Sequence, residues 1–217
     1  MCGRYALTMP PDAVRTYFRF GENPNFPPRG NIRPTEPVPL VVADRGERHF
    51  ALMRWGFIPG FVKNEKEFPL LINARAETVF EKPSFRNAIK RRRCLFVADG
   101  FYEWQKLDEK GKQKRPFLIR RPMQGLIALG GIWECWTSPD GSEIDTAAIL
   151  TTSANATMAA IHDRMPVILD PPDFDAWLSP ETPHLDVIRM LTPVNDEALE
   201  LVPITRVPPE PEAGELL

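Results

Sequence analysis

The residue with the most distinctive potential chemistry is Cys2, which directly follows Met1. Because an initiator methionine is removed when the next side chain is small, we expect a mature chain that begins with Cys2. That residue would carry a free α-amine and a thiol on adjacent carbons. An α-amine has a pKa of about 7.7–8.0, so a useful fraction is unprotonated at neutral pH. Such an amine can attack an aldehyde to give a Schiff base, and the thiolate can then close a five-membered thiazolidine ring.

Two other interpretations of Cys2 remain open at the level of sequence. Its thiolate could attack an acyl carbon with the α-amine as the base, or the residue could be buried and inert. The other cysteines, Cys94 and Cys135, make an odd total of three without C-x-x-C spacing. This pattern indicates neither a zinc site nor a disulfide framework, so we expect no metal, no cofactor and a reducing compartment.

Glu103 and His162 are candidates for acid–base chemistry. Glu103 lies between Tyr102 and Trp104 after an apolar stretch, where partial desolvation is expected to raise the pKa of its carboxyl. His162 follows a predicted helix and precedes an apolar strand, and histidine is the usual proton-transfer group near neutral pH. Both also have structural explanations. A glutamate at a strand end is common, and a histidine at a helix C-terminus often only complements the helix dipole.

Aromatic and basic side chains are the candidate nucleic-acid contacts. The stretch Arg-Trp-Gly-Phe-Ile-Pro-Gly is apolar but broken by glycine and proline, which predicts a loop that presents Trp55 and Phe57. These rings could fill the core or stack on bases, a contact worth about 1–3 kcal/mol per base. The densest basic cluster comprises Lys82, Arg86 and the run 90–93. It is either the solvated end of a helix or a phosphate-facing surface.

The composition is that of an ordinary globular domain. The 217 residues are 43% hydrophobic and 26% charged, and the net charge is −2. A nucleic-acid partner would therefore have to bind a local basic patch. The 24 prolines predict many loops and few long helices. No stretch approaches the ~20 apolar residues that a membrane span requires, and no signal peptide is evident.

The periodicity predicts a single α+β domain over residues 1–206 and a disordered, acidic and proline-rich tail over 207–217. Strands are expected at 3–9, 94–98, 116–120, 126–136 and 146–151, with a hairpin formed by 38–43 and 49–54 and an edge segment within 194–201. Short helices are expected at 12–20, 84–92, 156–161, 173–178 and 183–190. Gly130 and Gly131 predict a bulge or a close approach of two backbones.

Five segments together resemble one known family. They are Met-Cys-Gly-Arg-Tyr at 1–5, Arg-Trp-Gly-Phe-Ile-Pro at 54–59, Asn-Ala-Arg-Ala-Glu-Thr at 73–78, Gly-Phe-Tyr-Glu-Trp at 100–104 and His-Asp-Arg-Met-Pro at 162–166. They resemble the SOS-response-associated peptidase family, whose members are also called abasic-site processing proteins. The resemblance extends over nearly the whole chain, in order, and five motifs in agreement are far more specific than any one.

The resemblance implies a single α+β domain with a curved, mostly antiparallel β core, flanked by short helices, and a groove for single-stranded DNA. It implies that Cys2 forms a thiazolidine crosslink with the open-chain aldehyde of an abasic site. Asn73 resembles the residue that positions the N-terminus and the sugar. Glu103 resembles the carboxylate that orients the amine and assists proton transfer, and His162 resembles the acid–base group that helps to open the sugar ring.

The resemblance also implies the DNA contacts and the setting. Arg4, Arg75 and Arg86 resemble phosphate contacts, and Trp55, Phe57 and Trp104 would line the groove. The expected partner is single-stranded DNA with abasic sites, including sites at junctions with duplex. We further expect a monomer in the cytoplasm, associated with the nucleoid when bound to damaged DNA, without membrane contact.

Three competing functions are compatible with the same residues. Cys2 could be the nucleophile of a cysteine peptidase, assisted by Glu103 and His162, that removes a short N-terminal extension. The chain could also be a non-covalent single-strand binder that does not need an amine at residue 2. Finally, the imine could lead to β-elimination and strand cleavage. Thiazolidine closure would suppress this lyase reaction, so we expect it mainly when the thiol is lost.

Overall fold

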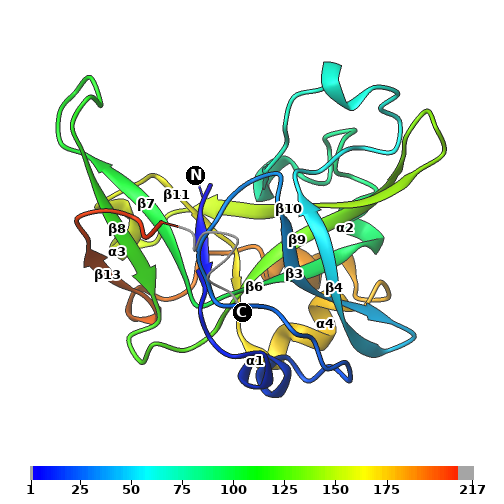
Figure 1. The fold of residues 1–217 in the computed structure, drawn as a ribbon, viewed down its shortest axis with the longest axis horizontal. Coiled ribbons are helices and arrows are strands. Elements are labelled where there is room, and N and C mark those ends of the chain that lie inside the picture. Colours follow the sequence, from blue (N-terminus) through cyan, green and yellow to red (C-terminus); the bar gives the residue numbers. More distant parts are fainter. Residues whose placement is uncertain (1, 210–217) are drawn as a thin grey trace.

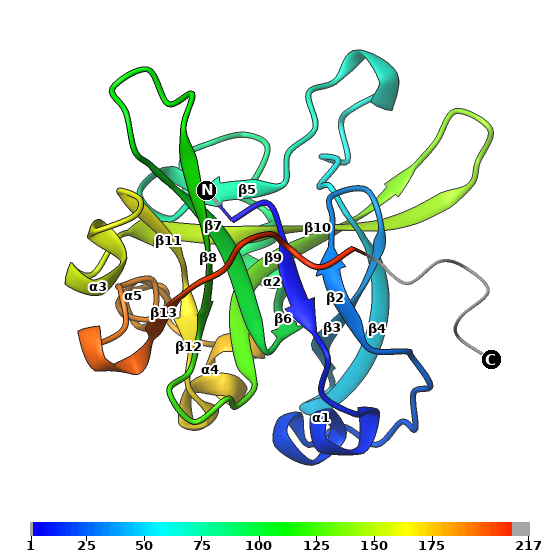
Figure 2. The same cartoon turned by 60° about the vertical axis from the view of Figure 1, so that its left-hand side comes forward.

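We analysed a computed structural model, in which residues 2–209 are described. Within these residues the protein has two sheets. The first has the strand order β13-β8-β7-β1-β2, in which β1 pairs with both β2 and β7. All of its neighbouring strands are antiparallel. The strands are β1 (Tyr5–Leu7), β2 (Arg29–Ile32), β7 (Gly100–Lys106), β8 (Lys114–Arg120) and β13 (Glu200–Pro203). This sheet therefore places the N-terminal segment against β7, which carries Glu103 (Figures 1 and 2).

The second sheet closes into a ring. Its order is β11-β10-β4-β3-β6-β9-β12, and β9 also pairs with β10, so that five strands return to their starting point. Only the pairs β10–β4 and β10–β5 are parallel. The strands are β3 (Pro37–Asp44), β4 (Glu47–Trp55), β5 (Asn73–Arg75), β6 (Arg93–Ala98), β9 (Ile127–Thr137), β10 (Glu143–Ser153), β11 (Arg164–Pro166) and β12 (Ile168–Leu169). The curved, mostly antiparallel core of a single α+β domain is thus confirmed.

Gly131 on β9 is one reason why the ring can close. A Cβ at this position would lie 2.6 Å from the ring of Phe96 on β6. The same Cβ would lie 3.0 Å from the backbone oxygen of Ala148 on β10, so a side chain there would require its neighbours to shift. The predicted close backbone approach is confirmed at Gly131, whereas the atoms nearest to Gly130 belong to side chains.

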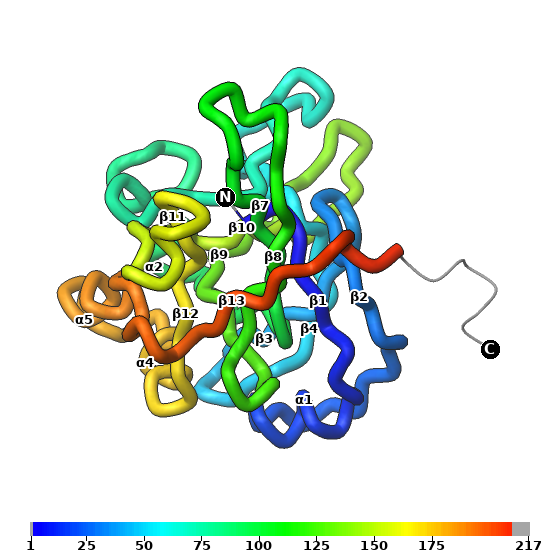
Figure 3. Tube along the Cα trace, turned by 90° about the vertical axis from the view of Figure 1, so that its left-hand side faces the viewer, coloured from blue at the N-terminus to red at the C-terminus, as the bar shows by residue number. Residues whose placement is uncertain are grey.

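Within residues 2–209, five short α-helices flank the sheets (Figures 1 and 3). They are α1 (Pro11–Phe18), α2 (Ala88–Arg91), α3 (Ala156–Ala159), α4 (Phe174–Leu178) and α5 (His184–Arg189). The rings of Phe18 and Phe174 stack at 5.4 Å and join α1 to α4. Asn155 caps α3 by accepting a hydrogen bond from Met158 N, as its residue type predicts.

The chain departs from the predicted elements in several places. The helix expected over 84–92 is only four residues long, because residues 83–87 form turns and Arg93 already belongs to β6. Strands β5 and β7 were not among the predicted strands. Strand β2 lies inside the proline-rich segment 21–37, which had no predicted element. The predicted tail begins at Val207, and its residues 210–217 lie outside the described part of the chain.

Candidate active site

Cys2 lies immediately before β1 and is almost completely buried, with 1% of its surface exposed. Strand β1 pairs with β7 at Tyr5↔Phe101, and the ladder continues with a 2.9 Å hydrogen bond from Tyr102 N to Arg4 O. The antiparallel register therefore carries residues 2–4 along Tyr102 to Trp104. The sheet, rather than any local motif, brings the thiol close to the carboxylate of Glu103.

Glu103 influences the thiol electrostatically. Burial raises the pKa of Cys2 far above its usual value, and the nearby Glu103 carboxylate raises it further. The buried thiol is consequently protonated at neutral pH, and it needs a proton acceptor before it can act as a nucleophile. Glu103 is itself 95% buried, with 5% of its surface exposed. A carboxylate in this position can accept the proton that the thiol must lose.

Asn73 connects β5 to the start of the chain. Its Nδ2 donates a 3.0 Å hydrogen bond to the backbone carbonyl of Cys2. Strand β5 is held in place by parallel pairing with β10, where Asn73 lies beside Ile149. The Oδ1 atom of Asn73 is buried and has no hydrogen-bond partner among the described residues. Because a buried acceptor without a partner is costly, this oxygen is suited to receive a hydrogen bond from a ligand or an amine.

His162 follows α3 and precedes β11. The Nδ1 atom of His162 lies 2.9 Å from Arg164 N and 2.8 Å from Asp163 Oδ1. It accepts from the backbone N–H when the ring is neutral, and it can donate to Asp163 when the ring is protonated. In the neutral ring the proton is therefore on Nε2. A 2.9 Å hydrogen bond from Gln105 Nε2 to Ala160 O joins the segment before His162 to β7, the strand that carries Glu103.

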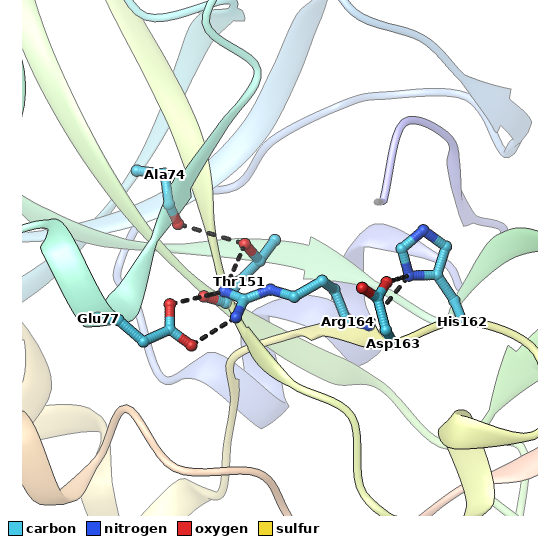
Figure 4. A network of polar contacts seen from close by, with 6 residues as sticks. All are labelled: Ala74, Glu77, Thr151, His162, Asp163 and Arg164. Atoms are coloured by element: carbon cyan, nitrogen blue, oxygen red, sulfur yellow. Dashed lines mark hydrogen bonds and ion pairs between the residues drawn. The ribbon is translucent and has the colours of Figure 1, made fainter.

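A polar clamp, formed by Glu77, Thr151 and Arg164, fixes the elements that carry Asn73 and His162 (Figure 4). Arg164 makes a two-pronged ion pair with Glu77, in which Nη2 lies 2.9 Å from Oε2. The same Nη2 donates to Thr151 O at 2.6 Å. Thr151 Oγ1 in turn lies 3.5 Å from Ala74 O, next to Asn73. The clamp thus ties β5, β10 and β11 together directly behind two of the candidate site residues.

The ion pair in the clamp predicts a pH-dependent stability. Arg164 lowers the pKa of Glu77, chiefly through their hydrogen bonds. The ionised carboxylate therefore stabilises the folded protein fully at pH values above the unfolded pKa of about 4.3. This stabilisation is lost as the pH falls through the lower pKa of the folded state. Because half of the Glu77 side chain is exposed, we expect Glu77→Gln to cost up to about 1 kcal/mol at pH 7. Urea unfolding at pH 7 and pH 3 should show that this difference vanishes in acid. Glu81→Gln is the control, and a cost that is equal at both pH values would contradict the ionic role.

Arg4 and Trp104 lie together at the edge of the site. The guanidinium carbon of Arg4 is 6.0 Å from the centre of the Trp104 ring, and its Nη1 donates to Asn31 Oδ1 at 3.3 Å. Both side chains are partly exposed. Arg75, beside Asn73, and Arg86 are exposed. The side chains of all four residues are therefore accessible to a ligand.

The prediction that Trp55 and Phe57 line a DNA groove is wrong for this structure. Their exposed fractions are 0% and 1%. Trp55 ends β4, packs 5.4 Å from the ring of Tyr5 and donates from Nε1 to Ile72 O at 2.9 Å. Phe57 packs against Phe85. Gly56 and Pro59 do interrupt the strand here. The side chains of Trp55 and Phe57 nevertheless point into the core, because the closed second sheet packs over them.

The aromatic side chain that this region does expose is Phe61. It is 60% exposed and makes an edge contact with Phe68, at 6.3 Å between ring centres, within the loop that joins β4 to β5. This loop rises on the same side of the molecule as the β7–β8 hairpin (Figures 1 and 2). The sequence contains the signal, an aromatic residue directly after Pro-Gly, but it does not indicate which ring of the segment faces solvent.

The basic run 90–93 is divided between surface and core. Arg93 is buried, with its guanidinium directed at the carbonyl oxygens of Ile89, Lys90, Trp177 and Ser179. Burial lowers the pKa of Arg93 to about 10, and Arg92 is paired with Glu134 at 2.6 Å. A phosphate-facing role is therefore excluded for Arg93, which instead holds the end of α4 against β6.

Residues 2–209 contain neither a candidate metal site nor a candidate membrane-spanning helix. No group of three or more His, Cys, Asp or Glu side chains there is arranged to hold a metal ion. Within the same range, no helix has the length and apolarity needed to cross a membrane.

Comparison with known proteins gives a consistent result. The chain is 36% identical to the abasic site processing protein YoqW of Bacillus subtilis over 216 residues, which cover 98% of this chain and 96% of that protein. It is 31% identical to the abasic site processing protein HMCES of Xenopus tropicalis, covering 90% of this chain and 71% of that protein. A crystal structure of a protein from Bacteroides thetaiotaomicron superposes with a TM-score of 0.85 at 25% identity, covering 94% and 92% of the two chains.

The family model described as SOS response associated peptidase (SRAP) matches residues 1–207. This match includes every strand and helix described above and all of the candidate site residues. The chain therefore belongs to the SOS response associated peptidase family.

Proposed function

We propose that this protein recognises abasic sites in single-stranded DNA and joins itself to them covalently through Cys2. Removal of Met1 would release the α-amine of Cys2 beside Glu103 and Asn73. The observation that carries the proposal is the position of Cys2, where a hydrogen bond from Asn73 and the field of Glu103 converge on an otherwise buried residue. An inert core cysteine needs neither neighbour. The names of the relatives, which are abasic site processing proteins, support the same substrate.

The proposed reaction begins with opening of the abasic sugar to its aldehyde, which requires an acid and a base. His162, with Nδ1 held by Arg164 N, has its second ring nitrogen as the proton-transfer atom. The Cys2 amine then adds to the aldehyde carbon, and loss of one water gives the imine. The Cys2 sulfur adds to the imine carbon, and the thiol proton passes by way of Glu103 to the ring nitrogen. The aldehyde carbon keeps its oxidation level through addition, loss of water and ring closure, so neither an oxidant nor a reductant is required.

DNA binding is proposed to rest on exposed or partly exposed basic and aromatic side chains. Arg4, Arg75 and Arg86 would contact phosphates, while Trp104 and Phe61 would stack on neighbouring bases. An abasic site has no base to read, so selectivity would come from the aldehyde and from flanking stacking. Because the phosphate contacts release counterions, binding should weaken as salt is raised.

A gel assay tests the proposal directly. The protein is mixed with a single-stranded oligonucleotide that has one abasic site, and the products are separated under denaturing conditions. We expect an adduct whose intact mass equals the DNA plus the chain without Met1, less one water. Absence of an adduct, with the DNA intact, would favour the peptidase or the simple binder instead. Cleaved DNA without an adduct would favour a lyase.

Two aromatic substitutions should separate the core from the binding surface. Trp55→Phe removes the hydrogen bond to Ile72 O and leaves a small cavity, so we expect it to lower the free energy of unfolding by about 2 kcal/mol. Phe61→Ala should change stability by less than about 0.5 kcal/mol, yet weaken single-strand binding by about 1–3 kcal/mol. Urea unfolding and fluorescence anisotropy measure the two quantities. The assignment fails if Phe61→Ala leaves binding unchanged.

A further inference from the structure

The β7–β8 hairpin projects from the body of the protein beside the N-terminus (Figures 1 and 2). Its outer part, residues 106–115, is here called the basic arm. It contains five basic and two acidic side chains, a net charge of +3 in a chain whose overall charge is −2. All five basic side chains are exposed, and none of them takes part in an ion pair within the described residues.

The positive charges on the basic arm lower the stability of the hairpin. Lys106 lies directly opposite Lys114 in the antiparallel register, and like charges in such a pair destabilise a sheet. Asp108 forms no ion pair with either lysine within the described residues, and its carboxylate instead accepts hydrogen bonds from the backbone N–H groups of Lys112 and Gln113. A bound polyanion would remove this repulsion.

The basic arm is continuous with the candidate active site. Trp104 and Lys106 are two residues apart on β7, so their side chains share one face of the sheet. Lys114 and Pro116, their partners on β8, lie on the same face. Arg4 lies over the Trp104 ring at the base of this face. The resulting stripe runs from residues beside Cys2 outward along β7 to Lys106, and the turn that follows carries Lys110 and Lys112.

We propose that the basic arm binds the phosphates of the single strand that flanks the abasic nucleotide. The inference rests on the proposed function, and it adds a second contact region to the site. Lysines are point charges on flexible stems, which suit contacts that are independent of sequence. The aromatic ring of Trp104 within the same stripe favours an unpaired strand over a duplex, because only unstacked bases can stack on it.

The test uses an arm variant in which Lys106, Lys110, Lys112 and Lys114 are all replaced by Gln. The control variant, with Arg15→Gln, Arg19→Gln, Arg45→Gln and Arg189→Gln, loses the same charge from exposed or half-exposed positions outside the arm. Binding is measured by anisotropy at several salt concentrations, with DNA that contains a tetrahydrofuran analogue of the abasic site. This analogue has no aldehyde, so the result does not depend on covalent chemistry. Adduct formation by the wild type on true abasic DNA is assayed in parallel.

For long single strands, we expect the arm variant to bind more weakly than the control variant. Its slope of log affinity against log salt should be shallower by about 1.4–2.8, as the loss of two to four phosphate contacts requires. Oligonucleotides with one flanking nucleotide on each side should show no such difference, and neither should sites flanked on both sides by duplex. The midpoint temperature of the arm variant should equal or exceed that of the wild type, because the repulsion between Lys106 and Lys114 is gone.

Two results would overturn this proposal. The arm is not a phosphate contact if both variants have the same salt slope on long single strands. It contacts duplex instead if the slope changes only with duplex flanks. Either result leaves the proposed function intact provided that the wild type forms its adduct. Absence of that adduct would count against the proposed function alone.

Discussion

Replacement of Cys2 by Ala is expected to abolish the covalent adduct with abasic single-stranded DNA. Asn73 and Glu103 would remain in place, and the α-amine exposed by Met1 removal would remain as well. This amine can still form an imine, but no sulfur is available to close the ring. We therefore expect cleavage of the DNA strand by β-elimination in place of a stable adduct. A denaturing gel with intact mass measurement distinguishes the two products.

A second variant separates the thiol from the amine. Insertion of one Ala between Met1 and Cys2 keeps the thiol but makes the cysteine nitrogen part of an amide. We expect no thiazolidine adduct, because the amide nitrogen of the cysteine cannot attack an aldehyde and the α-amine of the inserted Ala is one residue away from the thiol. Mass spectrometry of the unmodified protein verifies the N-terminus of each preparation. An adduct of normal yield with the inserted variant would mean that the thiol or another residue reacts by itself, and the proposed function would be wrong.

Replacement of Glu103 by Gln is expected to slow crosslinking by about 10²–10⁴-fold, the usual contribution of a general acid or base. Gln has nearly the same size and shape as Glu but cannot take up the proton that the buried Cys2 thiol must lose. The same change should slow release of DNA from a preformed crosslink, since ring opening needs the reverse proton transfer. Single-turnover rates of formation and release, measured with saturating DNA, test both directions.

Tyr102→Phe is the matched control for Glu103→Gln. It alters the adjacent position of β7 and removes the 2.7 Å hydrogen bond from the Tyr102 hydroxyl to Gly30 O. We expect the control to crosslink within about threefold of the wild type, because a lost neutral hydrogen bond costs only about 0.5–1.5 kcal/mol of stability. A Glu103→Gln protein that releases DNA as fast as the wild type would rule out the proposed role in reversal.

Local elements were predictable where a local cause determines them. Two apolar stretches, 38–43 and 49–54, on either side of Asp44-Arg45-Gly46 predicted the hairpin that the structure shows as β3 and β4. The short helix predicted at 12–20 is α1 in the structure. By contrast, β2 and the closure of the ring depend on partners distant in sequence. The pairing of β9 with both β6 and β10 is such a case, and no local pattern encodes it.

The burial of aromatic residues was not predictable for the same reason. Trp55 and Phe57 could belong to either a core or a stacking surface, and the glycine between them and the Pro-Gly that follows suggested a loop. Which side of that loop faces solvent depends on the strands that pack against it. The structure buries both rings and exposes Phe61. Arg93 shows the opposite case, a charged residue in a basic run that is buried because four backbone carbonyls receive it.

The sequence by itself determined the chemical inventory of this protein: an aminothiol at Cys2, a carboxylate at Glu103, an imidazole at His162 and the motifs that mark its family. Only the tertiary structure decided how these groups are placed. Asn73 is 71 residues from Cys2 and nevertheless donates a hydrogen bond to its carbonyl. Such contacts arise from strand registers between distant segments, because a sheet aligns backbones whatever their separation along the chain. Residue types are a local property, whereas distances within a site are set by the packing of the whole fold.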